Sequence, residues 1–317
     1  MAHELRSMMQ GRVVLRGDDD YARTRKIWNS AVENQPALFA VCETSGDVQA
    51  SVRVARRNGL PFSVRGGGHD WAGRALCADG LVIDLSRMRQ VVVDPDSRVA
   101  TVAGGASNKD VAVAAGSHGL LAALGNCGAV GIAGLALGGG YGPFNGLYGL
   151  AADNLLGAEV VLADGRLVRI GPDEEPELFW AIRGGGGNFG VVTSLRVQLH
   201  ETHHMLAGPI VYPWSEAEPV LRRYAAFAAT MPDELGISVG MPSGPDGQPM
   251  LLLLPLWNGD KRRGERIISD LQALGTPQLA HVGPMNYGDM LARFDAAVDA
   301  ADGCHWETRT RSLSALT

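Results

Sequence analysis

The sequence predicts an α+β protein built from two units, and three observations support this fold class. Residues 36–200 alternate short β-branched strands with amphipathic helical segments and tight turns. Near residue 205 the pattern changes to strands and helices that suit an antiparallel sheet. At 317 residues the chain is long enough for two ordinary domains, each with its own core. We therefore place one domain at 1–204, with its core at about 35–200, and a second domain at 205–317.

The elements of the first unit follow from periodicity and turn residues. Alternating or continuous apolar runs indicate strands, and "DVQASVRVARRNG" has the spacing of a helix that ends at Gly59. Asp-Pro-Asp-Ser at 94–97 and Asp-Gly at 164–165 indicate the turns of two hairpins. In chain order we predict a strand at 36–43, a helix at 47–59, a strand and glycine turn at 61–69, a strand at 80–86, a hairpin at 90–106, a helix at 108–120 with Asn108 near its cap, a hairpin at 157–171, a helix at 176–184 and a strand at 190–199.

The second unit has fewer motifs. We predict a strand at 207–214, a helix at 215–231, two strands within 236–257 and a helix at 260–275. The last residues, "GCHWETRTRSLSALT", stop inside a segment that reads as structured, and a chain ending there would leave a sheet edge open. We therefore expect the second domain to be partial, with the chain truncated at its C-terminus.

Composition and charge exclude several classes of function. A net charge of −6 and a pI near 5.8 give no basic footprint for nucleic acid. No stretch reaches 18 consecutive apolar residues, so we expect no membrane partner, and the N-terminus lacks the apolar core of a signal peptide, which favours a cytoplasmic location. The 4 cysteines form no CxxC pair, and "HETHH" (200–204) lacks the spacing of a zinc helix, so we expect no metal.

Glycine is the outlier of the composition. It provides 42 of the 317 residues, and 8 of them fall within the 18 residues "GNCGAVGIAGLALGGGYG" at 125–142. Clustered glycine indicates backbone held in unusual conformations or pressed against a ligand. Cys127 is the one reactive group in this run. A single cysteine is more often a small buried hydrophobe than a reactive thiol, so both alternatives stay open at this point.

A second glycine cluster, "VRGGGHDW" at 64–71, follows a predicted strand. Successive backbone N–H groups in such a turn can form a concave nest for a phosphate. Arg65 could add a charge to the anion or brace the loop, and His69 would emerge at the edge of the ligand. The alternative is a tight surface turn with an exposed histidine.

A third cluster, "GGGNFG", matches the GxGxxG spacing of dinucleotide-binding loops at Gly185, Gly187 and Gly190. That fingerprint needs a strand before it and a helix after it, so that the helix N-terminus meets the pyrophosphate. Here a helix precedes the motif and a strand follows it. We therefore reject a Rossmann site.

Together, the first two clusters resemble a known family. The pattern R-x-G-G-H followed by G-x-C-x-x-V-G-x-x-G-x-x-x-G-G-G-x-G is similar to the berberine-bridge-enzyme-like branch of the vanillyl-alcohol-oxidase flavoproteins. This chain carries it on Arg65, Gly67, Gly68, His69, Gly125, Cys127, Val130, Gly131, Gly134, Gly138, Gly139, Gly140 and Gly142. Further matching segments lie at 80–95, 148–165 and 178–193, so the resemblance covers about residues 35–200.

The resemblance implies that the first domain is a PCMH-type FAD-binding domain made of two α/β subdomains. It implies that FAD is attached twice, by an 8α-histidyl bond at His69 and a 6-S-cysteinyl bond at Cys127. It also places Val130 where oxygen reaches the flavin, and a valine there resembles the oxidases of the family. The full set of residues expected to bind the cofactor is Arg65, Gly66, Gly67, Gly68, His69, Asp70, Cys127, Val130, Gly131, Gly134, Gly138, Gly139, Tyr141, Gly142, Gly190 and Val191.

The activity implied by the resemblance is an FAD-linked oxidase. Its partners would be a small-molecule substrate, with hydride taken from an alcohol, hemiacetal or amine carbon, and O₂, which is reduced to H₂O₂. A dehydrogenase that uses another electron acceptor and a non-catalytic flavin-binding fragment are the alternatives. The family's Y-x-N-Y motif, from which a catalytic base is expected, does not occur in these residues, so the base stays unassigned and is expected in a missing C-terminal part.

Overall fold

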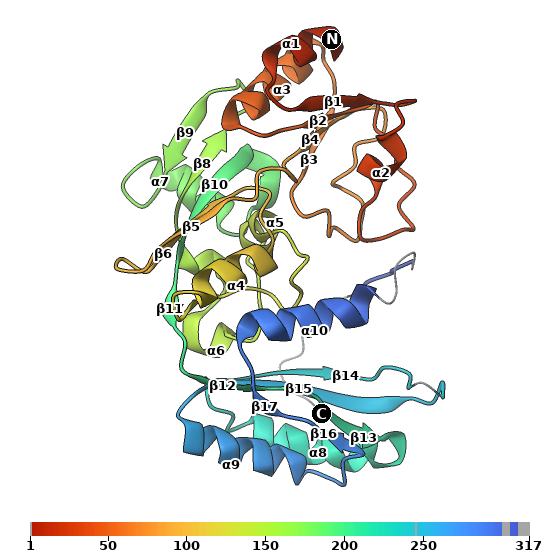
Figure 1. Ribbon diagram of the computed structural model, residues 1–317, viewed down its shortest axis with the longest axis vertical. Coiled ribbons are helices and arrows are strands. Elements are labelled where there is room, and N and C mark those ends of the chain that lie inside the picture. Colours follow the sequence, from red (N-terminus) through yellow and green to blue (C-terminus); the bar gives the residue numbers. More distant parts are fainter. Residues whose placement is uncertain (1, 245, 300–304, 310–317) are drawn as a thin grey trace.

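A four-stranded sheet gathers the N-terminal strands of the computed structural model, which describes residues 2–244, 246–299 and 305–309. Its order is β1-β2-β4-β3, with β2, β4 and β3 parallel and β1 antiparallel to β2. All residues of β2 and β4 are buried, as expected of strands covered on both faces. One face packs on α1 and α3, and the other packs on the segment around α2 (Figure 1). The elements are α1 (Ala2–Met8), β1 (Arg12–Leu15), α2 (Tyr21–Arg25), β2 (Leu38–Val41), α3 (Ser45–Arg57), β3 (Phe62–Arg65) and β4 (Leu81–Asp84).

A five-stranded antiparallel sheet of order β5-β6-β10-β8-β9 follows. Short helices pack over it, and α4 starts at a capping box in which the Ser107 side chain and Asp110 satisfy each other's backbone N–H groups. A two-stranded ribbon joins β7 to β11. The elements are β5 (Val91–Asp94), β6 (Val99–Ala103), α4 (Asn108–Gly116), β7 (Leu120–Leu121), α5 (Ile132–Leu137), α6 (Asn145–Tyr148), η1 (Ala151–Asn154), β8 (Leu155–Val161), β9 (Leu167–Ile170), α7 (Pro176–Ile182), η2 (Gly186–Phe189), β10 (Val191–Gln198) and β11 (His200–Glu201).

The remaining strands form a six-stranded antiparallel sheet around the long strand β15. Helices α8 and α9 cover the face of this sheet that is turned away from the rest of the molecule, and α10 lies between the sheet and α4 (Figure 1). The elements are β12 (His204–Ala207), β13 (Ile210–Pro213), η3 (Trp214–Glu216), α8 (Ala217–Ala228), β14 (Leu235–Gly240), β15 (Met250–Gly259), α9 (Lys261–Gln272), β16 (Leu279–Ala280), β17 (Gly283–Pro284) and α10 (Tyr287–Asp299).

The structure confirms the α+β class and contains each element that the sequence predicted. It adds elements that local patterns did not reveal, among them β12 and α10. It also shows that part of the glycine run packs in the core. Residues 132–137 of that run form α5, and Ile132, Ala133, Ala136 and Leu137 are buried in the core.

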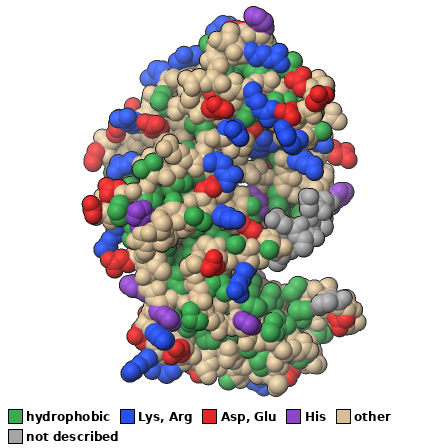
Figure 2. Space-filling model, in the orientation of Figure 1, with side chains coloured by type: hydrophobic (Ala, Val, Ile, Leu, Met, Phe, Trp, Pro, Cys, Tyr) green, Lys and Arg blue, Asp and Glu red, His purple; other side chains and the backbone are tan. Residues whose placement is uncertain are grey.

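One buried cluster contains residues from both units. Met205, Leu256, Tyr287 and Leu291 belong to the same buried cluster as the residues packed on the five-stranded sheet. Figure 2 shows the surface hollowed between the two units, with hydrophobic side chains along the hollow.

Three expectations concern features that the structure addresses only in part. The expected truncation falls on the chain end, most of which (residues 300–304 and 310–317) lies outside the described residues. Among the described residues, none of the helices has the length and apolar character needed to cross a membrane, and no cluster of three or more potential metal ligands occurs.

Candidate functional site

The two glycine-rich segments found in the sequence lie against each other. A Cβ atom on Gly67 would stand 2.4 Å from the backbone nitrogen of Gly131, and a Cβ atom on Gly131 would stand 2.4 Å from the nitrogen of Gly67. The turn after β3 is completed by Gly68, whose φ of +68° favours glycine. Both glycines at the contact are therefore needed for the approach of one backbone to the other.

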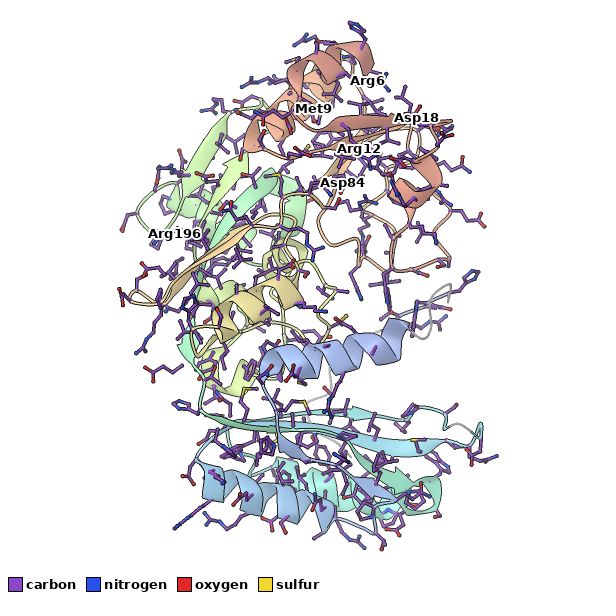
Figure 3. The ribbon with its side chains drawn as sticks, in the orientation of Figure 1. Arg6, Met9, Arg12, Asp18, Asp84 and Arg196 are labelled. Carbon is purple, nitrogen blue, oxygen red and sulfur yellow. The ribbon has the colours of Figure 1, made fainter. Side chains whose placement is uncertain are left out.

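The Arg65 side chain holds this turn in place by hydrogen bonds within the protein. Its Nε donates to Asp84 Oδ1 at 3.1 Å, one of its terminal nitrogens donates to Asp84 Oδ2, and the other donates to the carbonyl oxygens of Thr24 and Lys26. Asp84 ends β4, the strand next to β3 (Figure 3). Of the two roles considered for Arg65, this geometry matches the brace, because its donors are engaged within the protein.

The turn and the glycine run bring His69 and Cys127 together. Cys127 Sγ lies 3.5 Å from His69 Nε2, although 58 residues separate them along the chain. The Cys127 segment is fixed on the first turn of α4, because the Asn108 side-chain amide donates to the Cys127 carbonyl at 2.9 Å and the Lys109 N–H donates to the Gly128 carbonyl at 3.0 Å. Imidazole and thiol thus share one edge of the site.

The plane of the His69 ring is set by aromatic stacking. Trp28 stacks on His69 with ring centroids 4.4 Å apart, and Trp306 stacks on Trp28 at 4.9 Å. The Asn29 side chain ties the backbone of Trp306 to this region through hydrogen bonds of 2.9 and 3.0 Å. Trp28 was not among the site residues predicted from the sequence, because no local motif marks it.

The protonation states of the pair follow from burial and from one carboxylate. Burial lowers the pKa of His69 below its ordinary value, so the imidazole is neutral at pH 7. Burial, together with the neighbouring carboxylate of Asp295, raises the pKa of Cys127 to about 11. At neutral pH the site therefore holds a neutral imidazole beside a protonated thiol.

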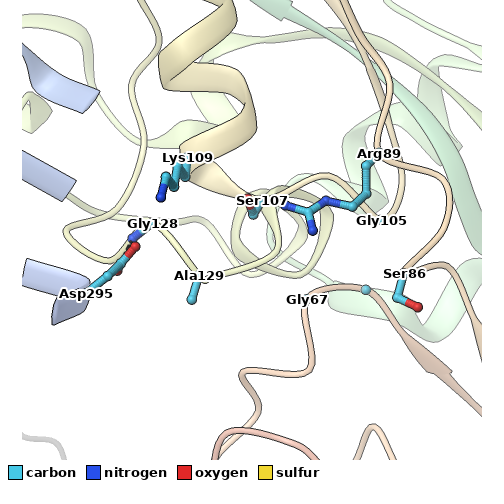
Figure 4. Close-up of a pocket in the computed structure, with 10 residues that line it drawn as sticks. Gly67, Ser86, Arg89, Gly105, Ser107, Lys109, Gly128, Ala129 and Asp295 are labelled. Carbon is cyan, nitrogen blue, oxygen red and sulfur yellow. Dashed lines mark hydrogen bonds between the residues drawn. The ribbon is translucent and has the colours of Figure 1, made fainter. Parts of the chain in front are cut away.

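A cavity of about 280 Å³ lies at the two segments that carry His69 and Cys127, where Gly67 and Gly128 line it (Figure 4). Four of its ten lining residues are glycines, and the cationic side chains of Arg89 and Lys109 and the carboxylate of Asp295 also line it. Glycine walls admit a flat ring, while cations and hydroxyls suit a phosphate. The lining residues are Gly66, Gly67, Ser86, Arg89, Gly105, Ser107, Lys109, Gly128, Ala129 and Asp295. A whole ligand site usually measures about 300–1,000 Å³. This cavity is smaller, so its donors fit only part of a dinucleotide cofactor.

Several residues expected at the cofactor have other contacts in the structure. Asp70 accepts hydrogen bonds from the backbone of the following turn, at Ala72 and Ala75. Gly142 packs on the Leu124 carbonyl, and Gly190 packs on β8. Close packing of the chain on itself therefore explains these two glycines without a ligand.

The other expected residues lie at varied positions around the glycine run. Gly134, Gly138 and Tyr141 are exposed, Tyr141 at 74%, while Val130 and Gly139 are partly buried and Val191 is buried. Val130 is not among the residues that line the cavity, whereas its neighbour Ala129 is.

Residues 36–171, which carry both glycine segments, match a family model described as an FAD binding domain. The fold superimposes with a TM-score of 0.88 on 6-hydroxy-D-nicotine oxidase from Arthrobacter nicotinovorans, at 37% identity over 94% of this chain and 66% of that one. Berberine-bridge-enzyme-like 1 from Physcomitrella patens gives a TM-score of 0.80 at 25% identity, over 90% of this chain and 63% of that one. This chain contains an FAD-binding domain, and the proteins it resembles include an FAD-linked oxidase and a berberine-bridge-enzyme-like protein.

A third structure of the same fold is xylooligosaccharide oxidase from Myceliophthora thermophila. It gives a TM-score of 0.80 at 28% identity, over 92% of this chain and 63% of that one. The chain thus spans less than two thirds of the length of these three proteins. What these matches support for this chain is an FAD-binding domain, into which the cavity between the two glycine segments fits.

The structure adds site residues that sequence reasoning missed. Asp295 contacts Cys127 from α10, and Lys109 enters the cavity from α4. Asp295 is separated from Cys127 by 168 residues along the chain, and the packing of α10 on α4 brings them together. Lys109 carried a weak signal, because it follows the capping residues of a predicted helix.

Proposed function

We propose that this chain is the FAD-binding part of an oxidase in which His69 and Cys127 each hold the flavin by a covalent bond. The substrate would be a small molecule that loses hydride from an alcohol, hemiacetal or amine carbon, and O₂ would be reduced to H₂O₂. The observation that carries this proposal is the 3.5 Å approach of His69 Nε2 to Cys127 Sγ, on the two segments whose glycines Gly67 and Gly128 line a cavity.

Two further observations support an oxidation of this kind. Two of the related proteins named above are oxidases, one of a nicotine derivative and one of xylooligosaccharides, which offer an amine carbon and a hemiacetal carbon. Val130 lies three residues after the proposed cysteine anchor, and its small side chain is consistent with access of oxygen.

In this proposal, the residues of the chain bind and orient while FAD, when bound, supplies the hydride acceptor. Arg89 and Lys109 would offset the negative charge of the diphosphate. His69 would offer a neutral nitrogen, oriented by its stacking on Trp28. Cys127 would offer its sulfur after losing the thiol proton, because the thiolate is the nucleophile.

Flavin fluorescence on a denaturing gel tests the two attachments. Wild-type protein is expected to keep its yellow fluorescence after denaturation, since a covalent bond survives unfolding. Each single variant, His69→Ala or Cys127→Ala, should keep part of the covalent flavin, and the double variant should keep none. Cys77→Ala is the matched control, because Cys77 is a partly exposed cysteine away from the cavity. Release of all flavin from the denatured wild type would contradict the proposal.

Peroxide measurement separates the oxidase from the dehydrogenase. Reduced protein mixed with air-saturated buffer should release H₂O₂ and return to its oxidised absorbance spectrum. Reoxidation only by an added dye would contradict the oxidase assignment and favour a dehydrogenase.

A further inference from the structure

Asp295 makes the closest side-chain contact to the thiol of Cys127. Its Oδ1 lies 3.3 Å from Cys127 Sγ and accepts the Gly128 backbone N–H at 2.8 Å. One carboxylate oxygen thus holds both the thiol and the next peptide unit. The contact comes from α10, a helix beside the six-stranded sheet, whereas Cys127 belongs to the FAD-binding domain.

The space around this contact is tight, so the carboxylate has little freedom to move away. A Cβ atom on Gly128 would stand 2.4 Å from Asp295 Oδ2 and 3.1 Å from Lys109 Cβ. Only glycine at position 128 lets the carboxylate reach the thiol. Upstream, the Tyr287 hydroxyl donates to the Gly125 carbonyl at 2.6 Å and fixes the start of α10 on the same segment.

Three titratable or charged side chains stand around the thiol, one from each neighbouring element. Asp295 approaches from α10, His69 Nε2 approaches to 3.5 Å from the turn after β3, and Lys109 lines the adjoining cavity from the first turn of α4. The ring of His69 is neutral at pH 7, because burial lowers its pKa. Among the described residues, no ion pair joins Lys109 to Asp295, so the carboxylate is the dominant charge in contact with the sulfur.

We propose that Asp295 is a positioning residue for Cys127, which holds the sulfur beside His69 as a hydrogen-bonded thiol and delays its conversion to the nucleophilic thiolate. The physical reason is that a carboxylate accepts the S–H bond but repels the negative sulfur that would replace it. Asp295 thereby sets the pH range in which Cys127 reacts.

A consequence for the cofactor rests on the function proposed above. Bonding of sulfur to the flavin ring replaces a ring hydrogen, so the thiol hydrogen and the ring hydrogen leave as two protons. The two electrons left behind reduce the ring, and O₂ removes them together with two protons as H₂O₂. Attachment through Cys127 therefore requires deprotonation of the thiol and should accelerate with rising pH until the thiol is ionised.

The test is a pH titration of Cys127 alkylation by iodoacetamide in full-length protein purified from riboflavin-limited cells, before flavin is attached. Peptide mass spectrometry gives the rate at Cys127 separately from the other cysteines. In the wild type the rate should reach half its maximum near pH 11, the value to which burial and Asp295 raise the pKa of Cys127. Asp295→Asn keeps the shape of the side chain and removes its charge. It should move the midpoint down by about 1 pH unit or more.

Asp289→Asn is the matched control, because Asp289 lies on the same helix, loses the same charge and hydrogen-bonds to Asn286 rather than to the thiol. An equal midpoint in Asp295→Asn, Asp289→Asn and wild type would overturn the proposal. If Asp295→Asn did not fold, Asp295→Ser would replace it. The wild-type titration can also overturn the proposal by itself. If the alkylation rate of Cys127 reached half its maximum at the ordinary thiol pKa of 9.0, no carboxylate would be suppressing the thiolate.

Adding FAD to the same proteins separates this inference from the proposed function. Asp295→Asn should accumulate Cys127-linked flavin at a lower pH than the wild type, measured as flavinylated Cys127 peptide. If no protein forms this bond at any pH, the second covalent attachment is wrong, while the alkylation titration still decides the role of Asp295.

Discussion

Arg65 and Asp84 form a buried ion pair beneath the glycine turn, with Arg65 8% and Asp84 1% exposed. A buried pair contributes little net stability compared with apolar residues, but removal of one partner leaves a charge without compensation. The pair therefore matters chiefly for the shape of the loop that ends in His69.

Asp84→Ala is expected to lower the free energy of unfolding by about 3–5 kcal/mol, because Arg65 would remain buried without its partner. The double variant Arg65→Met, Asp84→Leu should lose less than Asp84→Ala alone. Urea unfolding at pH 7 measures both. Glu218→Gln breaks an exposed ion pair with Arg222 and should change the urea midpoint little. A loss in Asp84→Ala no greater than in this control would show that the buried pair is dispensable.

At the scale of elements, the two glycine segments differ in what their glycines do. Gly131 meets the backbone of Gly67, which cannot withdraw as a flexible side chain could. Gly134 lies three residues further on, inside α5, with nothing within 4 Å of its Cβ position. The same substitution at these two sites should therefore have opposite effects.

Gly131→Ala is expected to destabilise the protein by about 1–3 kcal/mol, as overpacking does, and to displace the turn that carries His69. Gly134→Ala should instead stabilise it by roughly 0.4–1 kcal/mol, since alanine suits a helix and restricts the unfolded chain. Thermal unfolding monitored by circular dichroism compares the two. Destabilisation by Gly134→Ala would contradict the open position of this glycine. Loss of bound FAD in a stable Gly134→Ala protein would place the cofactor on this face of α5.

How far the sequence predicted these elements depended on how local their signals are. Hairpins turned at Asp94-Pro95-Asp96-Ser97 and at Asp164-Gly165, and the helix that ends before Gly59, follow from neighbouring residues and appear in the structure as predicted. The proximity of His69 and Cys127 could be predicted from the resemblance of their motifs to those of a known family. The roles of Asp295 and Trp28 could not be predicted, because their contacts depend on packing between segments far apart in the chain and no motif accompanies either residue.

At the scale of the whole molecule, α10 connects the two units at the site. Tyr287 is buried, its ring meets Phe144 edge to face at a centroid distance of 4.8 Å, and its hydroxyl donates to Gly125 in the FAD-binding domain. Leu291 and Tyr287 belong to the core that also contains the residues packed on the five-stranded sheet. Because one buried cluster spans both units, we expect them to unfold together.

Tyr287→Ala should make the two units unfold less cooperatively, since it removes a buried ring and leaves the Gly125 carbonyl without its hydroxyl donor. Truncation of a buried aromatic residue costs about 3–5 kcal/mol. Hydrogen exchange measures the effect in each unit. In the wild type, the most protected amides of β10 and β15 should open with similar free energies. In Tyr287→Ala, β15 should lose protection before β10, because the six-stranded sheet no longer shares the core through α10.

Tyr224→Ala, which removes a tyrosine packed only within the second unit, should lower the protection of β15 without moving Asp295 away from Cys127. Alkylation of Cys127 reports that distance, so a shifted pH midpoint in Tyr287→Ala but not in Tyr224→Ala would show that the thiol responds to the packing of α10. Equal midpoints in the two variants would show that the contact between Asp295 and Cys127 persists without this anchor.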